Sequence, residues 1–340
     1  MRRVAAVLCA VILAVVPAAA QDSPSLAPVE PLPPPFELWM SSLRVEAAAR
    51  GIRPEIIQQA FDGVEPVEQI LERDRAQAEF TLNLEAYLAR RLTRQTVRTA
   101  QKMYATHRTL LHRVADTYKV SPRILVAVWG LESNFGRFAG VRPTIATLTT
   151  LAYDQRRGAM FRSELFSALE ILNRGDIEFD RLKGSWAGAL GQPQFMPSSY
   201  LLYAQDFDGD GRRDIWRSEP DVFASVANFL KEHGWTNGVT WGREVKVPAS
   251  ARAAASAVPL RETGCRAAKV MTDPRPLSAW RRMGVRTMNG TPVPSGALKA
   301  SLVRAGARSF LLYPNYESIL GYNCAHTYAL SVALLSDRLH

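Results

Sequence analysis

Residues 121–137, SPRILVAVWGLESNFGR, decide how the rest of the chain is interpreted. Ser121 and Pro122 form a helix start, with serine at the N-cap and proline at the first helical position. The run from Ile124 to Leu131 is apolar on every face, which predicts a helix buried on all sides.

Glu132 ends this run and is the candidate general acid. Desolvation and the negative end of the helix dipole both disfavour a charged carboxylate, so both should raise its pKa toward neutrality. The residues that follow break the helix and should keep the carboxyl group at the edge of a cleft. The competing interpretation is an ordinary glutamate that turns outward or pairs with Arg137 or Arg142.

A second carboxylate is missing nearby, since the next acidic residue after Glu132 is Asp154. Glycosidases commonly use two carboxylates, one as acid and one as base or nucleophile. One carboxyl group suffices where the substrate supplies its own nucleophile, because it can protonate the leaving oxygen and then accept the proton of the attacking hydroxyl. The sequence is therefore compatible with an intramolecular glycosyl transfer.

An acidic loop, DFDGDGRRDIWR at 206–217, matches the first nine positions of an EF-hand Ca²⁺ loop. The twelfth position is Arg217, where the usual loop has a bidentate glutamate, so the last carboxylate must come from Glu219 or Asp221. We favour Asp221, because it precedes a helical run that it would also cap. A solvated turn rich in Asp and Gly is the alternative. The expected ligands of a structural Ca²⁺ are Asp206, Asp208, Asp210, Arg212 through its carbonyl, Asp214 and Asp221.

The N-terminal segment 1–20, MRRVAAVLCAVILAVVPAAA, is typical of a secretory signal peptide cleaved near Ala20. Its apolar run is too short to span about 30 Å of hydrocarbon, which disfavours an uncleaved membrane anchor. Residues 21–35 are rich in proline and predict an extended tether.

The remaining residues, 36–340, are expected to form one catalytic domain of mainly α (α+β) class. Helical patterns predict a helical lobe at about 36–115 and a core at about 116–240. A mixed C-terminal part is expected at about 241–340, with a short strand in VTWGREVKVP. The Ala-rich stretch 250–264 is interpreted as a surface excursion or a boundary between lobes.

Composition limits the class of protein and of partner. The chain has 340 residues, of which 47% are hydrophobic and 22% charged, which excludes collagen-like, coiled-coil and wholly disordered chains. Lys+Arg 42 against Asp+Glu 32 gives +10, and loss of Arg2 and Arg3 with the signal segment leaves +8. This mild excess suits a polymer that carries carboxylates, and no motif supports nucleic-acid binding.

Two cysteines, Cys265 and Cys324, remain outside the signal segment, in an oxidising compartment. We favour a disulfide between them. Two buried free thiols are the alternative, because cysteine also packs as a small hydrophobe.

Three motifs resemble the lytic murein transglycosylase B family, in the family's order. They are ESNFGR at 132–137, GSWAGALGQPQFMPSSY at 184–200, and the acidic loop followed by SVANFLKEHGW at 225–235. The resemblance runs from about residue 36 to the C-terminus. It implies a lysozyme-like core with additional helical and C-terminal regions around a deep peptidoglycan groove, in the periplasm. Glycan strands are the implied partner, with the machinery of wall synthesis or division as a further one.

The resemblance also implies a reaction. The family cleaves the β-1,4 bond between N-acetylmuramic acid (MurNAc) and N-acetylglucosamine (GlcNAc) without water, and the muramoyl 6-hydroxyl closes on the anomeric carbon to give a 1,6-anhydro end. One glutamate acts as acid and then as base, and Glu132 occupies its place. A hydrolytic muramidase and a non-catalytic peptidoglycan-binding scaffold are the alternatives.

Carried over by motif, six residues are expected to bind substrate, with ordinary packing as the alternative for each. This sequence departs from the family where Phe229 replaces a common tyrosine, and where Gln192 and Pro193 replace a tyrosine-glycine pair. The six residues are Tyr87, Ser185, Gln194, Tyr322, Asn323 and Tyr328.

Overall fold

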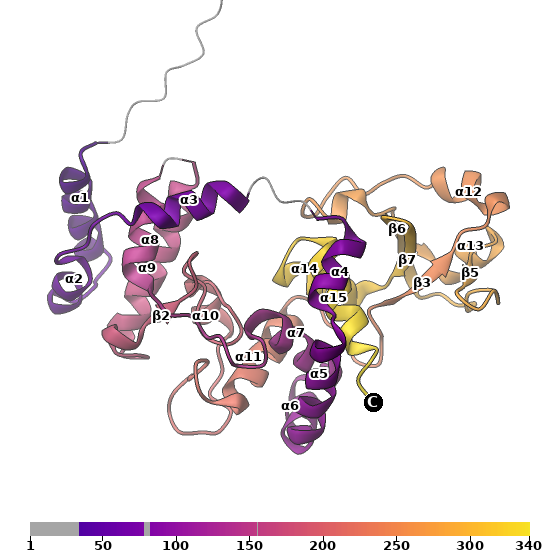
Figure 1. Cartoon of the computed structure of the whole chain (residues 1–340), viewed down its shortest axis with the longest axis horizontal. Coiled ribbons are helices and arrows are strands. Elements are labelled where there is room, and N and C mark those ends of the chain that lie inside the picture. Colours follow the sequence, from indigo (N-terminus) through magenta and orange to yellow (C-terminus); the bar gives the residue numbers. More distant parts are fainter. Residues whose placement is uncertain (1–33, 78–81, 155) are drawn as a thin grey trace, which may run out of the picture.

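The structure is a computed structural model that describes residues 34–77, 82–154 and 156–340. It confirms a mainly α-helical fold with a small antiparallel sheet. Figure 1 shows the elements in three groups along the long axis, with helices α1 and α2 at one end and the sheet at the other. The central group holds α7, the helix that ends near Glu132.

The first group joins N-terminal helices to two helices from the middle of the chain. The rings of Phe36 and Trp39 each lie 5.2 Å from the ring of Tyr153. Arg156 and Arg157 both pair with the buried carboxylate of Asp74, which fixes α3 beside the other helices. The elements are α1 (Phe36–Ala49), α2 (Pro54–Phe61), α3 (Glu68–Gln77), α8 (Thr144–Tyr153) and α9 (Gly158–Arg174).

The central group surrounds α7 (Pro122–Ser133). Every residue from Ile124 to Leu131 is buried, which confirms the prediction from the apolar run. Ser121 is the N-cap as expected, although its side chain makes no capping hydrogen bond. The helices that pack directly on it are α5 (Arg94–Thr106), α6 (Arg108–Tyr118), α11 (Glu219–Glu232) and α15 (His326–Ser336). Outside them, α4 (Leu84–Arg91) packs on α15, α10 (Pro197–Tyr203) on α11 and α9, and α14 (Pro314–Tyr322) on α11 and α15.

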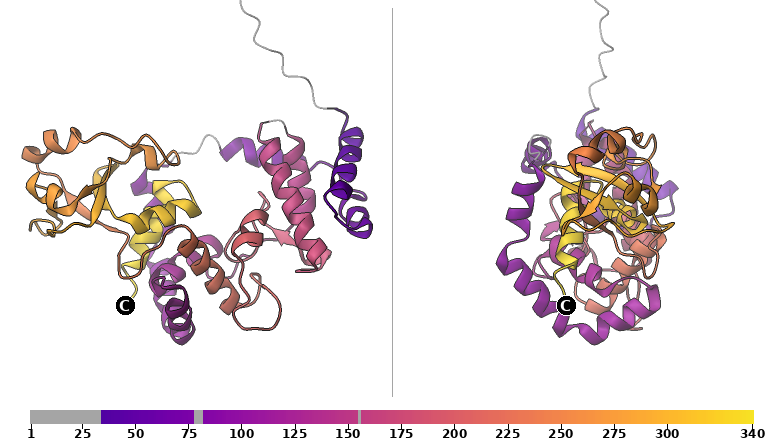
Figure 2. Two further views of the ribbon diagram at one scale, coloured as in Figure 1. Left: turned by 180° about the vertical axis from the view of Figure 1, so that it is seen from behind. Right: turned by 90° about the vertical axis from the view of Figure 1, so that its right-hand side faces the viewer.

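The third group is a five-stranded sheet in the order β4-β6-β7-β3-β5, at the end of the molecule opposite to α1 (Figure 2). One face, with Val303 and Phe310, joins the main core. The other face, with Val245 and Leu302, packs with the fully buried Trp280 in a second core. The strands are β3 (Gly242–Lys246), β4 (Arg275–Pro276), β5 (Arg286–Thr287), β6 (Lys299–Ala305) and β7 (Arg308–Leu312), with helices α12 (Ala249–Ser256) and α13 (Leu277–Arg282).

The packing divides the chain differently from the lobes expected at about 36–115, 116–240 and 241–340. Helices α1–α3 pack with α8 and α9, whereas α4–α6 pack around α7 and its neighbours, and α14 and α15 return to the core from the C-terminal part. The reason is α7 itself, which needs cover on every side. The stretch expected to be an excursion or boundary contains α12, with Ala251 and Ala255 buried.

The favoured disulfide is present between Cys265 and Cys324. The expected signal peptide at 1–20 lies outside the described residues, as does most of the tether. Among the residues that are described, no helix has the length and apolar character needed to cross a membrane. A two-stranded sheet and two single-turn helices complete the fold: β1 (Arg142–Pro143), β2 (Lys183–Gly184), η1 (Phe179–Arg181) and η2 (Ala268–Val270).

Candidate active site

The C-terminal end of α7 carries Glu132 into an abrupt change of chain direction. Asn134, Phe135 and Gly136 are consecutive residues in the left-handed region, with φ of 52°, 60° and 77°. The ring of Phe135 folds back over Gly130, where a Cβ would lie 2.4 Å from the ring. Glycine at this position therefore permits the tight turn that leaves Glu132 partly exposed while its neighbours are buried.

Glu132 has the protonation balance expected of a general acid. Burial raises the pKa of its carboxyl group to about 7, and this effect outweighs a hydrogen bond from Tyr328 and the positive charge of Arg91, which both lower the pKa. At neutral pH the group is therefore present in both its acid and its base form.

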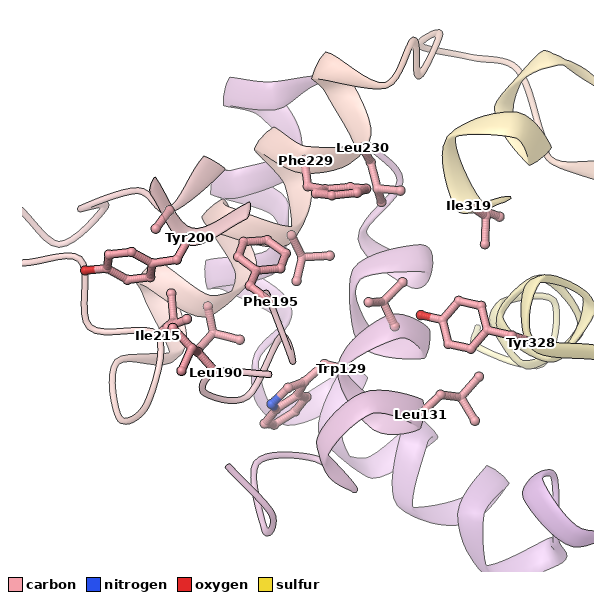
Figure 3. Packing of buried hydrophobic residues seen from close by; sticks show 14 of the residues in the cluster. Trp129, Leu131, Leu190, Phe195, Tyr200, Ile215, Phe229, Leu230, Ile319 and Tyr328 are labelled. Carbon is pink, nitrogen blue, oxygen red and sulfur yellow. The ribbon is translucent and has the colours of Figure 1, made fainter. Parts of the chain in front are cut away.

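Tyr322 and Tyr328 form a wall beside this carboxyl group. Their rings are stacked, with centroids 6.4 Å apart. Burial raises the pKa of both hydroxyl groups well above the usual value, and the charge of Glu132 adds to the effect, so both stay protonated. Figure 3 shows the Tyr328 ring directed from the C-terminal helices toward the side of the core where Phe195 and Phe229 lie.

The two hydroxyl groups differ in their partners. The Tyr322 hydroxyl donates a 2.7 Å hydrogen bond to the Pro193 carbonyl. The Tyr328 hydroxyl is close enough to Glu132 to lower its pKa, but it is buried without a hydrogen bond of regular geometry. It is thus a donor held beside the carboxyl group. Tyr87, on α4, acts electrostatically on Tyr328 and so belongs to the same cluster.

Phe229, the expected departure from the resembled motif, lies in an aromatic cluster behind Tyr322. Its ring stacks on His233 with centroids 3.9 Å apart and lies 4.7 Å from the ring of Tyr322. The ring is buried, so its contribution is apolar support for Tyr322 in place of a hydrogen bond.

The loop before α10 carries Ser185 and Gln194, both half-buried. The Ser185 hydroxyl oxygen accepts hydrogen bonds from the amides of Ala187 and Ala189, at 3.2 and 3.1 Å, which leaves its proton available for a ligand. Gln194 has a φ of 54° and donates through Nε2 to the Gly191 carbonyl at 2.8 Å. Backbone geometry thus holds both side chains in fixed positions.

Not all the expected residues contact the carboxyl group. Tyr328 acts on Glu132 directly, the charge of Glu132 acts on Tyr322, and Tyr87 acts on Tyr328. Within the described residues, no hydrogen bond joins Glu132 to the remaining three, of which Asn323 is exposed at the end of α14. The three are Ser185, Gln194 and Asn323.

Arg91 is a site residue that sequence reasoning missed. Its guanidinium donates a short hydrogen bond to the carbonyl of Leu131, directly before Glu132, and its charge lowers the pKa of Glu132. The signal was its position four residues after Tyr87 on a helix, which places both residues on one face. Neither Arg137 nor Arg142, the pairing partners considered for Glu132, forms an ion pair in the described part of the chain.

The acidic loop gathers three of its expected ligands. Carboxylate oxygens of Asp206, Asp208 and Asp210 all lie within 4.8 Å of one another, and all three residues are exposed. Hydrogen bonds from the amides of Gly209 and Gly211 to Asp206, at 2.7 and 2.9 Å, hold the loop in a tight turn. Such a set of hard oxygen donors fits Ca²⁺.

Asp221 has a different place from the one expected. It is the third residue of α11 and does not cap it, because Ser218 is the N-cap. It is fully buried, and its two carboxylate oxygens accept from the amides of Phe207 and Asp214, each at 2.8 Å. Asp214 in turn accepts from two amides of the segment that follows it. In this arrangement Asp221 closes the loop by backbone hydrogen bonds.

Comparison with known proteins places this site in a family. Residues 35–337 match the transglycosylase SLT domain family. The chain belongs to this family. Its resemblance to lytic murein transglycosylases is thereby confirmed, and the match spans all three groups of elements.

Individual relatives agree with this assignment. A segment of 153 residues is 37% identical to the membrane-bound lytic murein transglycosylase B of Escherichia coli strain K12, and the match covers 45% of this chain but only 42% of that relative. The crystal structure of SltB3 from Pseudomonas aeruginosa in complex with NAG-anhNAM-pentapeptide has a TM-score of 0.80 and 40% identity, and covers 89% of this chain and 78% of that one.

The Escherichia coli lytic transglycosylase Slt35 in complex with calcium is also similar. Its TM-score is 0.72 and its identity 27%, with 88% of this chain and 91% of that chain covered. These similarities confirm the expected lysozyme-like, mainly α-helical fold class.

Proposed function

We propose that the protein is a lytic transglycosylase that cleaves the MurNAc-β-1,4-GlcNAc bond of peptidoglycan and leaves a 1,6-anhydro end. The observation that carries the proposal is a single carboxyl group, Glu132, whose pKa is raised to about 7 at the end of a buried helix. One group with that pKa can serve in turn as acid and as base.

In the first step, protonated Glu132 donates its proton to the glycosidic oxygen as the bond to the anomeric carbon breaks. The carboxylate that results then accepts the proton of the muramoyl 6-hydroxyl, whose oxygen attacks the same carbon. Glu132 ends protonated, and no water is consumed. The neutral hydroxyl group of Tyr328 keeps a hydrogen-bond donor beside the carboxylate through both steps, whereas Tyr322 donates to the Pro193 carbonyl.

Hydrolysis by a muramidase is supported less well. A hydrolytic mechanism usually places a second carboxylate near the acid, where its charge would raise the pKa of that acid further. Within the part of the chain that the structure describes, the side chains that shift the pKa of Glu132 are Tyr328 and Arg91, and no carboxylate is among them. A relative crystallised in complex with NAG-anhNAM-pentapeptide supports a site that accepts an anhydro end.

We assign the glycan groove to the side chains around Glu132. Tyr87, Tyr322 and Tyr328 would contact the sugar next to the scissile bond, because they cluster at the carboxyl group. Ser185, Gln194 and Asn323 would bind sugars further along the strand. The fixed backbone around Ser185 and Gln194 supports such a role, since it orients polar side chains before a ligand binds.

We assign a structural Ca²⁺ to the acidic loop, held by Asp206, Asp208 and Asp210, with Arg212 contributing its carbonyl and Asp214 a carboxylate. The clustered carboxylates and the calcium complex of a relative support it. Asp221 would complete the site either as a ligand or by holding the loop closed. A cleaved signal peptide and a periplasmic location remain part of the proposal, together with partners in wall synthesis or division.

The proposed reaction is tested by digesting purified peptidoglycan in water enriched in heavy oxygen. Transglycosylation should leave the muramoyl ends free of the label, because the oxygen that attacks comes from the sugar. Heavy oxygen at those ends would show hydrolysis. Binding of glycan without cleavage would favour a scaffold.

A further inference from the structure

A pocket of about 710 Å³ lies in the sheet lobe, and Val245 and Leu302 of the second core are among the residues that line it. We call it the sheet pocket. Its floor comes from β3, β6 and β7, and one wall comes from α12. Glu132 and the tyrosines around it do not line this pocket. A hollow this size is typical of a ligand site.

The rim of the sheet pocket is apolar. Leu260, Val270 and Met288 line it, and their side chains are 55%, 54% and 46% exposed. Beyond residue 202, the structure describes no other large hydrophobic side chain that is exposed. Their convergence on one opening marks a surface that contacts a partly apolar ligand.

The walls carry an excess of positive charge. Glu244 binds Arg308 through both of its carboxylate oxygens, at 2.8 and 2.5 Å, and is thereby neutralised. Lys246, Arg252 and Arg304 also line the pocket and are exposed. These three form no ion pair with any residue that the structure describes. Their positive charges are therefore available to an anionic ligand.

Helix α4 connects the sheet pocket with the active site. Near its start, the Glu85 carboxylate accepts a 3.1 Å hydrogen bond from the amide of Ala307, a pocket residue. At its end, Arg91 binds the carbonyl of Leu131 beside Glu132. Eight helical residues span about 12 Å, and an extended peptide of four residues spans about 13 Å. A peptide attached to a sugar at Glu132 is therefore long enough to follow α4.

We propose that the sheet pocket binds the carboxylate-bearing peptide stem of peptidoglycan, with the stem carboxylates on Arg252 and Arg304 and its aliphatic groups on the apolar rim. The ligand class rests on the proposed function. The positive walls, the apolar rim and the path along α4 select a short anionic peptide over a neutral sugar.

The test uses methionine-methyl NMR on the full chain carrying Glu132→Gln, so that turnover plays no part. The probe is the sugar-free tetrapeptide L-Ala-γ-D-Glu-meso-diaminopimelate-D-Ala. The Met288 methyl signal, assigned by Met288→Leu, reports the sheet pocket, whereas the Met196 signal reports the loop that carries Gln194. We expect saturable shifts at Met288 and none at Met196.

Two changes should weaken this binding by about tenfold or more, as expected for losing a charge-assisted contact. One is Arg304→Glu, with Arg281→Glu as the matched control, because Arg281 is exposed in the same lobe but does not line the pocket. The other is amidation of the peptide carboxylates, which leaves the protein unaltered and so does not depend on folding.

Shifts confined to Met196, no shift at all, or equal binding by Arg304→Glu and its control would each overturn the proposal. The product assay on the wild-type chain is separate. Absence of anhydro ends there would contradict the proposed reaction without changing the NMR result.

Discussion

The indole of Trp129 donates a 2.6 Å hydrogen bond to the side-chain oxygen of Gln192, which joins the buried helix α7 to the loop that carries Gln194. The Gln192 amide nitrogen continues the link by donating to the Trp216 carbonyl at 2.9 Å. Gln192 is itself buried, and its bond to Trp129 is shielded from water. One side chain thus fixes the distance between the acid helix and the proposed sugar-binding loop.

Gln192→Ala should leave the indole nitrogen and the Trp216 carbonyl without partners. The expected loss in the free energy of unfolding is about 1–3 kcal/mol, the cost of burying unsatisfied polar groups. Urea denaturation measures it. Gln194→Ala is the control, because Gln194 is half-buried and bonds only to its own loop, and its loss should be smaller. Equal losses would show that Gln192 has no special structural role.

Tyr328→Phe should raise the pKa of Glu132, because the lost hydroxyl lowers it by hydrogen bonding. The acid form starts the reaction, so activity falls as pH rises through this pKa. The basic limb of the profile of kcat/KM against pH should therefore move above its wild-type position near pH 7. A limb that moves to lower pH would contradict the assigned role of Tyr328.

Arg91→Gln should move the same limb in the same direction, because the positive charge of Arg91 also lowers the pKa of Glu132. Salt distinguishes the two effects, since ionic strength screens a charge but not a hydrogen bond. Raising the salt concentration should shift the wild-type limb toward that of Arg91→Gln. Arg90→Gln is the matched control on the same helix, and a shift as large as that of Arg91→Gln would argue against a specific interaction.

The acidic loop should respond to Ca²⁺ with a higher melting temperature, because an ion that binds only the folded state stabilises it. Asp210→Ala should abolish this rise and have little effect without the ion. Asp221→Asn should lower the melting temperature with or without Ca²⁺, because its buried carboxylate accepts two backbone amides. A rise of equal size in Asp210→Ala and the wild type would place the ion elsewhere.

Local patterns predicted the helix and its acid, but long-range packing decided their surroundings. The apolar run before Glu132 was sufficient to predict both burial and a raised pKa, since both follow from the sequence of one helix. Nothing in that run indicates that Arg91 on α4 would bind the carbonyl of Leu131. That contact depends on which helices cover α7.

Asp221 shows that local patterns can also fail for contacts between residues that are close in sequence. Its position before a helical run was equally compatible with an N-cap and with a metal ligand. The helix begins earlier, at Glu219 after Ser218. The buried Asp221 carboxylate accepts hydrogen bonds from the amides of Phe207 and Asp214. The outcome depended on the fold of the whole loop, which spacing alone does not describe.

In the proposed reaction, Glu132 alone serves as acid and base without water. It is tested most directly by the masses of the products that wild type and Glu132→Gln release from purified peptidoglycan. We expect muramoyl ends lighter by one water than hydrolytic ends for the wild type, and no products for Glu132→Gln. Reducing muramic acid ends from the wild type, or cleavage by Glu132→Gln at a comparable rate, would contradict it.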